Sequence, residues 1–349
     1  MSLGTDQRNA LRSVAPSGAA AGLSIVVPAY NEAASLARMH ARLVEVAQKL
    51  AATRGLACEV IYVDDGSADD TLAIARALPA SALDVQVVSL SRNFGKEAAL
   101  LAGLDHARLG AVLFIDGDGQ HPPQLIETLV GHWLDDDYDV VYTAKAHRDK
   151  ESFARRVAIK AFYALLNSDS HVQIPENAGD FRLLSPRAAR ALRQMPERNR
   201  FFKGLASWIG FRQKRIDYEP EQRAQGRSHW GLRSLIGLSL NGLTAFSVAP
   251  LRMATVFGLL LALIALIYGG KIIYETVVYG VSVPGYPSLF VGVMVLGAVQ
   301  LIMLGVVGEY IGKILYEIKG RPVYFVAEHD VKLRETAVQP QSDTRTAAE

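Results

Sequence analysis

Short apolar runs alternate with longer amphipathic stretches over the first two thirds of the chain. Each run is rich in β-branched residues and bounded by turn formers, which is typical of a buried strand. The predicted strands are Leu23–Val27, Glu59–Val63, Val85–Leu90, Ala111–Ile115 and Val140–Ala144. The predicted helices between them are Glu32–Leu50, Asp70–Leu78, Lys96–Ala107 and Pro122–Leu134. This alternation predicts an α/β domain with a mostly parallel sheet, which we place at residues 21–230.

Two of the predicted helices carry local signals at their starts. Ser67, with Asp70 three residues later, is a weak form of the capping box before the second helix. Pro122 and Pro123 suit the opening turn of the fourth helix, where a missing N–H costs nothing.

The C-terminal third follows a different pattern. Met253–Gly270 and Ser288–Gly308 contain no charged residue, and the second run would be about 31 Å long as a helix, close to the thickness of a bilayer core. Gly280, Pro284 and Pro287 break helix between them. We therefore expect two membrane-spanning helices within residues 251–318, and a buried hairpin in a globular domain is the alternative.

The segment before these runs is nearly uncharged and repeats apolar residues at helical spacing. Gly231–Ser247 is predicted to be an amphipathic helix in the membrane interface, within residues 231–250, or else a core-facing helix. Basic residues flank both spans on one side, whereas the loop from Thr276 to Pro287 has none. The positive-inside rule therefore places the α/β domain and both termini in the cytoplasm, at the cell (inner) membrane. Lys271 and Glu275 are one helical turn apart and are expected to pair.

The composition narrows the possible partners and the cellular compartment of the protein. The 349 residues carry 37 basic and 35 acidic side chains, so charge gives no reason to expect a nucleic-acid partner. The single cysteine, Cys58, precedes an apolar run and is predicted to be a buried, inert thiol in a reducing compartment. Residues 1–20 lack the apolar core of a signal peptide and are expected to be disordered, and residues 319–349 are expected to form a cytoplasmic tail, polar and structureless from about Glu335.

Three polar clusters directly follow predicted strands. They are Pro28–Glu32, Asp64–Ser67 and Asp116–Pro123. Ligands of parallel sheets bind at the carboxyl ends of the strands, where these clusters are expected to meet. Carboxylates gathered in one place resist burial unless a cation or hydrogen-bond donors offset their charge.

The third cluster is the most informative. Asp116 and Asp118 place two carboxylates within reach of one hard cation, and Gln120 adds a neutral oxygen. Mg²⁺ and Mn²⁺ favour such ligands, and substrate phosphate and water complete their shells. A solvated turn is the alternative for an isolated Asp-x-Asp, but the position after a strand favours a metal. His121 has no partner His or Cys at ligand spacing, so the sequence gives no case for zinc.

The other candidates have two interpretations each. Asp64 and Asp65 either cap the following helix or accept hydrogen bonds from a base or ribose. Lys96 either approaches phosphates or is solvated. The chain has neither Gly-x-Gly-x-x-Gly after its first strand nor a P-loop motif, which argues against both of those nucleotide-binding classes.

With these motifs in order, the sequence resembles family 2 glycosyltransferases of GT-A fold. Within them it is most similar to polyprenyl-phosphate glycosyltransferases, in particular bacterial bactoprenol glucosyltransferases, which are related to dolichol-phosphate mannose synthases. The likeness covers roughly residues 23–326. Besides the three clusters, it rests on Ser91–Glu97, Gly179–Leu183, Met195–Asn199, Gly285–Ser288 and Gly308–Gly312.

The resemblance implies a role for each part of the site. It implies a metal site of Asp116, Asp118 and Gln120, and catalytic roles for Asp118, Asp180 and Arg182. The implied nucleotide-binding residues are Pro28, Tyr30, Glu32, Asp64, Asp65, Lys96, Asp116 and Gly117. The implied contacts to acceptor phosphate or donor diphosphate are Arg200, Lys203, Arg223 and Ser228.

The implied activity is transfer of a hexose from a nucleotide sugar, UDP-glucose first, to undecaprenyl phosphate with inversion and with Mg²⁺ or Mn²⁺. A GDP-mannose-dependent synthase and a membrane-bound nucleotide-sugar-binding scaffold are the alternatives. A processive polysaccharide synthase would usually need more spans and a Gln-x-x-Arg-Trp segment, which the chain lacks. A homo-oligomer and a downstream flippase are further implied partners.

Overall fold

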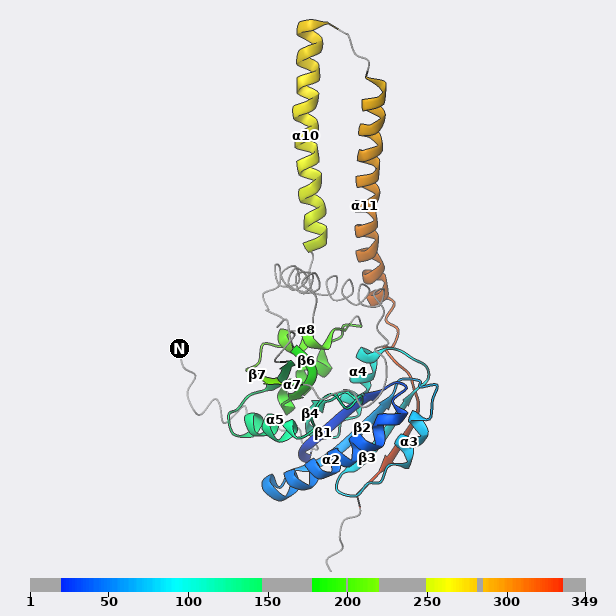
Figure 1. Cartoon of the computed structure of the whole chain (residues 1–349), viewed down its shortest axis with the longest axis vertical. Helices are drawn as coiled ribbons and strands as arrows, with labels where there is room; N and C mark the ends of the chain where they lie inside the picture. The colour runs from blue at the N-terminus through cyan, green and yellow to red at the C-terminus, as the bar shows by residue number, and fades with distance from the viewer. Residues whose placement is uncertain (1–19, 146–177, 199, 220–248, 281–284, 335–349) are drawn as a thin grey trace, which may run out of the picture.

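An eight-stranded sheet forms the body of the α/β domain in the computed structural model, which describes residues 20–145, 178–198, 200–219, 249–280 and 285–334 (Figure 1). The strand order is β7-β5-β6-β4-β1-β2-β3-β8. The five predicted strands are present as β1 Ala20–Ala29, β2 Ala57–Asp64, β3 Asp84–Leu90, β4 Leu109–Phe114 and β5 Val140–Lys145. Three further strands are β6 Ala178–Leu184, β7 Gln213–Tyr218 and β8 Val326–Lys332.

The pairing is mostly parallel, as predicted. The β4-β1-β2-β3 part of the sheet and the β5–β7 pair are parallel. Strand β6 runs antiparallel between β4 and β5, and β8 runs antiparallel along β3. Parallel strands are reached by crossover helices, which cover both faces of such a sheet.

Helices form the two outer layers. They are α2 Ala33–Arg54, α3 Thr71–Ala77, α4 Lys96–His106, α5 Leu125–Leu134, α7 Pro186–Gln194 and α8 Phe202–Trp208. One core lies under α2, α3 and α5, and the other lies under α4, α7 and α8. Helix α2 buries Leu36, Met39, Leu43 and Leu50, whose spacing of three, four and seven residues puts them on one face. The thiol of Cys58 is buried in the first core, and burial raises its pKa to about 12, which confirms an inert cysteine.

Both predicted helix starts are wrong in detail. Ser67 does not cap α3, which begins at Thr71. Its hydroxyl accepts the backbone N–H of Asn31 at 3.0 Å. Helix α5 begins at Leu125, so Pro122 and Pro123 lie in the turn before it, where their carbonyls accept the N–H groups of the first helical residues. At Ser67 a hydrogen bond to the distant Asn31 takes the place of the predicted cap. At Pro122 and Pro123 a turn precedes the helix that the local sequence predicted to begin there.

Two long helices leave the domain after β7. Figure 1 shows α10 Ala249–Tyr279 and α11 Tyr286–Ile318 rising from it as a pair. Both contain a segment long and apolar enough to cross a membrane, Ala254–Tyr279 and Val291–Ile318, each with a mean hydropathy of 2.3 and none of it buried. The expected Lys271–Glu275 pair is present at 3.7 Å. Residues 231–248 of the predicted interfacial region 231–250 lie outside the described residues, and residues 249–250 begin α10.

The chain then returns to the sheet. Residues 319–349 are predicted only as a tail, but Val326–Lys332 forms edge strand β8 along β3. The guanidinium of Arg76 on α3 pairs with Glu328 and with Asp330, and the ring of Phe325 lies 6.3 Å from that of Phe94. The end of the helical hairpin is thus attached to the α/β domain.

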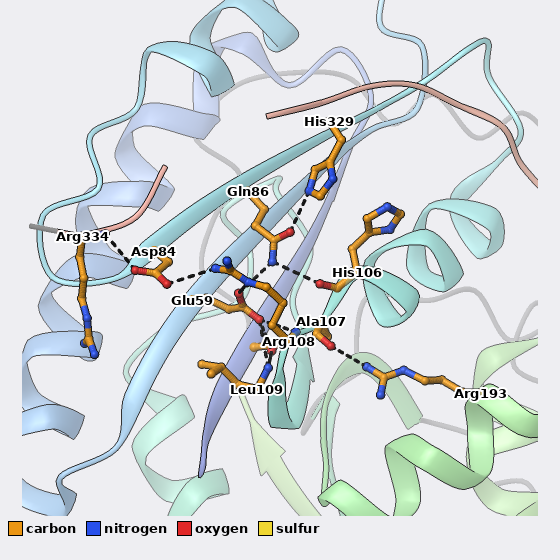
Figure 2. A network of polar contacts seen from close by, with 11 residues as sticks. Glu59, Asp84, Gln86, His106, Ala107, Arg108, Leu109, Arg193, His329 and Arg334 are labelled. Carbon is orange, nitrogen blue, oxygen red and sulfur yellow. Dashed lines mark hydrogen bonds and ion pairs between the residues drawn. The ribbon is translucent and has the colours of Figure 1, made fainter. Parts of the chain in front are cut away.

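A buried carboxylate organises the opposite end of the sheet from the strand-end clusters. Figure 2 shows Glu59 of β2 among Arg108, Gln86 and Leu109. Its oxygens accept hydrogen bonds from the Ser24 hydroxyl at 2.6 Å, from Arg108 Nε at 2.8 Å and from Gln86 Nε2 at 2.8 Å. Burial alone would raise the pKa of Glu59, but these hydrogen bonds lower it overall.

Replacing Glu59 with Ala should destabilise the domain by roughly 3 kcal/mol, because several buried donors lose their acceptor. Since the pKa of Glu59 is lowered, its contribution is present above its ordinary value of 4.5 and is lost as the pH falls. Thermal unfolding of both proteins across pH measures this. Glu127→Ala, which removes a partly exposed pair with Lys49, is the matched control and should change little. Equal effects of the two substitutions would contradict the assignment.

Candidate active site

The three predicted clusters meet at one edge of the sheet. Strands β4, β1 and β2 are parallel neighbours, so Asp116, Pro28–Glu32 and Asp64–Ser67 leave their carboxyl ends side by side. Strand β6 runs antiparallel to β4, with Phe114 opposite Arg182, and so brings Asp180 to the same edge. The topology therefore gathers residues that are far apart in the chain.

Lys96 joins two of these strand ends. At the start of α4, its Nζ lies 2.6 Å from Asp116 Oδ1 and 2.5 Å from Asp180 Oδ2. Lys203 Nζ lies 3.4 Å from the other oxygen of Asp180. Two cations and two carboxylates thus alternate across the end of the sheet.

These charges stabilise each other. Burial alone would lower the pKa of Lys96, but Asp116 and Asp180 raise it overall. Burial alone would raise the pKa of Asp180, but Lys203 and Lys96 lower it well below its usual range. The pKa of Asp116 is lowered in the same way, against burial and chiefly by Lys96. All three groups are therefore ionised at neutral pH.

A histidine and a tyrosine that the sequence did not assign to the site also face Asp116. His121 Nε2 lies 3.4 Å from Asp116 Oδ2, and its Nδ1 lies 2.7 Å from the hydroxyl of Tyr218 at the end of β7. Burial, and then the charges of Asp116, Asp118 and Asp180, raise the pKa of Tyr218. His121 and Tyr218 are 97 positions apart in the chain, so no local sequence pattern predicts their contact.

The Asp64–Ser67 cluster fixes the loop that carries Lys96. The carboxylate of Asp65 accepts the backbone N–H groups of Phe94 at 2.7 Å and Gly95 at 2.9 Å. Gly66 has φ +69°, and a Cβ there would lie 2.6 Å from the backbone carbon of Arg92. Asp65 and Gly66 therefore set the position of the α4 start, and a direct contact of Asp64 or Asp65 with a nucleotide stays a prediction.

The Pro28–Glu32 cluster turns the chain from β1 into α2. Asn31 has φ 55°, and the N–H of Glu32 donates to Thr71 Oγ1 at 2.8 Å. Ser35 Oγ lies 2.9 Å from Glu32 Oε2 and 2.8 Å from the carbonyl of Gly117, so this turn contacts the third cluster. The side chain of Tyr30 is 49% exposed, which leaves an aromatic surface at the edge of the site.

The residues of the predicted metal site fit a hard divalent cation by their chemistry. Asp118 Oδ1 accepts the N–H of Gln120 at 3.0 Å across a turn in which Gly119 has φ +72°. Within the described part of the chain, no three His, Cys, Asp or Glu side chains form a closed metal cage. An open site with one or two carboxylates is what Mg²⁺ and Mn²⁺ use when phosphates and water supply the other ligands.

Two of the predicted arginines, Arg182 with a catalytic role and Arg200 as a phosphate contact, hydrogen-bond to the protein backbone. Arg182 is buried, and its guanidinium donates to the carbonyls of Gly179 at 2.8 Å and Phe202 at 3.4 Å. Arg200 donates to the carbonyls of Glu197 at 2.9 Å and Met195 at 2.5 Å. Both therefore support the backbone around α8. Arg223 and Ser228 lie outside the described residues.

Glu97 is a further acid, partly buried, beside the site. Its carboxylate accepts the N–H of Phe202 at 2.9 Å, which ties α4 to the start of α8 next to Lys203. Burial and then the charge of Asp180 raise the pKa of Glu97 to about 7. A raised pKa means that the folded protein holds this proton more tightly than the unfolded chain.

The wild-type protein should therefore lose stability relative to Glu97→Gln as the pH rises from 4.5 to about 7, and the difference should be constant above that range. Thermal unfolding midpoints over this range measure the effect. The exposed Glu45→Gln should follow the wild type. Parallel curves for Glu97→Gln and the wild type would show that folding does not raise the pKa of Glu97.

Comparison with known proteins shows which family the chain belongs to. Residues 24–193 match the model of glycosyl transferase family 2, and residues 249–314 match the GtrB C-terminal hairpin. The chain is 43% identical over 306 residues to the uncharacterized glycosyltransferase sll0501 of Synechocystis, covering 88% of this chain and 95% of that protein. It is 41% identical over 304 residues to the SfII prophage-derived bactoprenol glucosyl transferase of Shigella flexneri, covering 87% and 97%.

A solved structure is similar at lower identity. The mannosyl-3-phosphoglycerate synthase of Rubrobacter xylanophilus is 19% identical, with a TM-score of 0.45 over 68% of this chain and 75% of that chain. The curated relatives match over nearly their whole length, catalytic domain and hairpin together. The chain therefore belongs to glycosyl transferase family 2, with a GT-A catalytic domain followed by a hairpin of the GtrB type.

Proposed function

We propose that the protein transfers glucose from UDP-glucose to undecaprenyl phosphate at the cytoplasmic face of the cell membrane, with inversion at the anomeric carbon. The observation that carries the proposal is the alternating array of Asp116, Lys96, Asp180 and Lys203 at the sheet edge of a domain attached to a membrane hairpin. The similar Shigella protein is named a bactoprenol glucosyl transferase, which supports a lipid phosphate as acceptor.

The charge array suits a reaction between two anions. The acceptor is a phosphate monoester whose second pKa is about 6, so at neutral pH it is largely a dianion and needs no strong general base. The barrier to the reaction is the electrostatic repulsion between the acceptor dianion and the diphosphate of the donor. Lys96 and Lys203 offer positive charge on either side of Asp180, which lowers that repulsion and orients the attack.

Asp116, Asp118 and Gln120 would hold a divalent cation, which supplies positive charge beside the departing diphosphate. Asp180 lies between the two lysines, in a position to orient a sugar hydroxyl or the acceptor phosphate, and the reaction does not require it to take a proton. Direct attack by the phosphate oxygen on the anomeric carbon predicts inversion. The α-linked donor would therefore give a β-linked lipid product.

A donor screen tests this function. Full-length protein in lipid nanodiscs would receive undecaprenyl phosphate and, in turn, UDP-glucose, UDP-galactose, UDP-N-acetylglucosamine and GDP-mannose. Mass spectrometry of the lipid and release of nucleoside diphosphate are measured with and without acceptor. We expect glucosyl lipid from UDP-glucose, loss of turnover with EDTA and recovery with Mg²⁺ or Mn²⁺. Turnover with GDP-mannose alone would favour the mannose synthase, and donor binding without transfer would favour the scaffold.

A further inference from the structure

One hydrogen bond joins the two chain segments that carry the lysines of the charge array. Lys96 and Glu97 are the first two residues of α4, and Phe202 and Lys203 are the first two residues of α8. The Oε2 atom of Glu97 accepts the backbone N–H of Phe202 at 2.9 Å. The bond therefore connects the residue after one lysine to the residue before the other.

Both lysines contact the same carboxylate. Lys96 Nζ lies 2.5 Å from one oxygen of Asp180, and Lys203 Nζ lies 3.4 Å from the other oxygen. The two cations keep this arrangement only while the helix starts that carry them stay at a fixed separation. Groups that act in a reaction need such support from surrounding hydrogen bonds, because a misplacement of about 1 Å costs a large part of the rate. The hydrogen bond of Glu97 is placed to supply it.

The partner of Glu97 is itself fixed by packing. The side chain of Phe202 is buried, and its ring lies edge-on to that of Phe114 with the ring centroids 5.4 Å apart. Phe114 is the last residue of β4, two residues before Asp116. The side chain of Phe202 thus packs against the strand that carries Asp116, while its backbone N–H reaches Glu97.

Arg182 extends this framework to Asp180. Its guanidinium donates to the carbonyl of Phe202 at 3.4 Å and to the carbonyl of Gly179 at 2.8 Å. Gly179 is the residue before Asp180. The backbone next to Asp180 and the backbone next to Lys203 are therefore held by one buried side chain.

The charge of Glu97 explains less than its hydrogen bond. Burial and then Asp180 raise the pKa of Glu97 to about 7, whereas Lys96 and Lys203 lower it, so the effects of the neighbouring charges oppose each other. A protonated carboxyl group still has an oxygen that accepts a hydrogen bond. The bond to Phe202 is therefore available in both protonation states.

We propose that Glu97 is a positioning residue for sugar transfer, whose hydrogen bond to the Phe202 backbone sets the separation of Lys96 and Lys203 around Asp180. The reaction that it supports rests on the proposed function, whereas the bond itself rests on the geometry of α4 and α8. Glu97 acts through the two lysines and is assigned no contact with either substrate.

Two variants separate the hydrogen bond of Glu97 from its charge. Glu97→Gln removes the charge and keeps a carbonyl oxygen at the same reach, whereas Glu97→Asp keeps the acid and withdraws its oxygens by one methylene group. In full-length protein in nanodiscs, we expect Glu97→Asp to lower kcat about tenfold, with the KM for UDP-glucose changed less than about twofold. The kcat of Glu97→Gln should stay within about twofold of the wild type.

The matched control is Glu127→Asp, because Glu127 is also an acid in the first turn of a helix, α5, but pairs with Lys49 at 2.7 Å. Its kcat should equal that of the wild type. A larger loss in Glu97→Gln than in Glu97→Asp would assign the effect to charge and overturn the proposal. Wild-type kcat in Glu97→Asp, or an equal loss in Glu127→Asp, would also overturn it.

A double-mutant cycle shows whether Glu97 acts through Lys203. Lys203→Met removes the cation whose position the bond is proposed to set. In the Lys203→Met protein, the further loss of kcat caused by Glu97→Asp should shrink from about tenfold to less than about threefold. The same tenfold loss in both proteins would show that Glu97 acts independently of Lys203 and would contradict the proposal.

Hydrogen exchange of the Phe202 amide tests the bond without sugar transfer. Mass spectrometry with electron-transfer fragmentation would compare this amide in the wild type, Glu97→Asp and Glu97→Gln. We expect exchange about tenfold faster in Glu97→Asp and within about twofold of the wild type in Glu97→Gln. The amide of Leu205, which donates to the carbonyl of Phe201 at 3.0 Å, is the internal control and should not change.

The exchange result is independent of the proposed function. If the donor screen finds no transfer, faster exchange at Phe202 alone still supports the bond, and only the proposed function fails. Unchanged exchange at Phe202 in Glu97→Asp, or an equal rise at Leu205, would overturn the positioning role even in an active enzyme.

Discussion

Asp118→Ala is expected to lower the rate of sugar transfer by roughly 1,000-fold or more, with the fold and the membrane insertion intact. Asp118 lies in the turn after β4, where its carboxylate accepts the N–H of Gln120 at 3.0 Å, so its loss disturbs a short turn and leaves the core in place. The large effect is expected because Asp118 is one of the two carboxylates in the proposed metal site, so its loss removes half of the protein's negative charge that would hold the cation.

Two measurements check this expectation. Turnover on undecaprenyl phosphate gives the rate, and calorimetric titration of UDP with and without Mn²⁺ gives the metal dependence of nucleotide binding. In Asp118→Ala, UDP affinity should no longer depend on Mn²⁺. The control is Asp70→Ala, an exposed aspartate at the start of α3, which should behave as the wild type. Wild-type turnover of Asp118→Ala would remove the metal assignment.

Asp180→Asn is expected to lower kcat by roughly 100-fold while changing the KM for the nucleotide sugar little. Asp180 balances Lys96 at 2.5 Å and Lys203 at 3.4 Å. Asparagine keeps the shape but removes the charge, so both lysines lose an anionic partner and Lys96 is left with Asp116. The lysines would then no longer be held where the two phosphates are expected to meet.

Steady-state kinetics with both substrates varied separates kcat from KM for this variant. Asp135→Asn is a suitable control, because Asp135 also holds a cation, Arg54, but on the exposed surface, where an ion pair contributes little. A raised donor KM with unchanged kcat in Asp180→Asn would place Asp180 in donor binding instead. Turnover close to the wild type would exclude a catalytic role.

The sequence predicted the elements whose pattern follows from burial. Strands β1 to β4 are covered by helices on both faces, so they appear as continuous apolar runs. Strands β6 and β7 are interrupted by charged residues, such as Arg182 and Lys214, and gave no such signal. Strand β8 is exposed along its whole length, so nothing in its composition distinguishes it from a tail.

The sequence predicted the residues of the candidate site that follow strands, and it missed those that distant segments bring together. Asp64 and Asp65 lie at the end of β2, and Asp116 and Asp118 follow β4. Both strands are parallel neighbours of β1, so topology alone brings the four residues to one edge. The Lys96–Asp180 contact depends on β6 pairing antiparallel with β4, and Asp180 was identified only through the family resemblance. His121, Tyr218 and Glu97 were missed as site residues because their environment comes from packing between distant segments.

Strand β8 has a consequence for the order in which the protein is made. The eighth strand of the sheet is encoded after both helices of the hairpin, so the ribosome must finish the hairpin before the edge of β3 can be covered. Until then the nascent domain presents an unpaired strand edge, which is the kind of surface that aggregates. Synthesis of the hairpin therefore precedes completion of the catalytic sheet, and a domain cut off before the hairpin would carry that bare edge permanently.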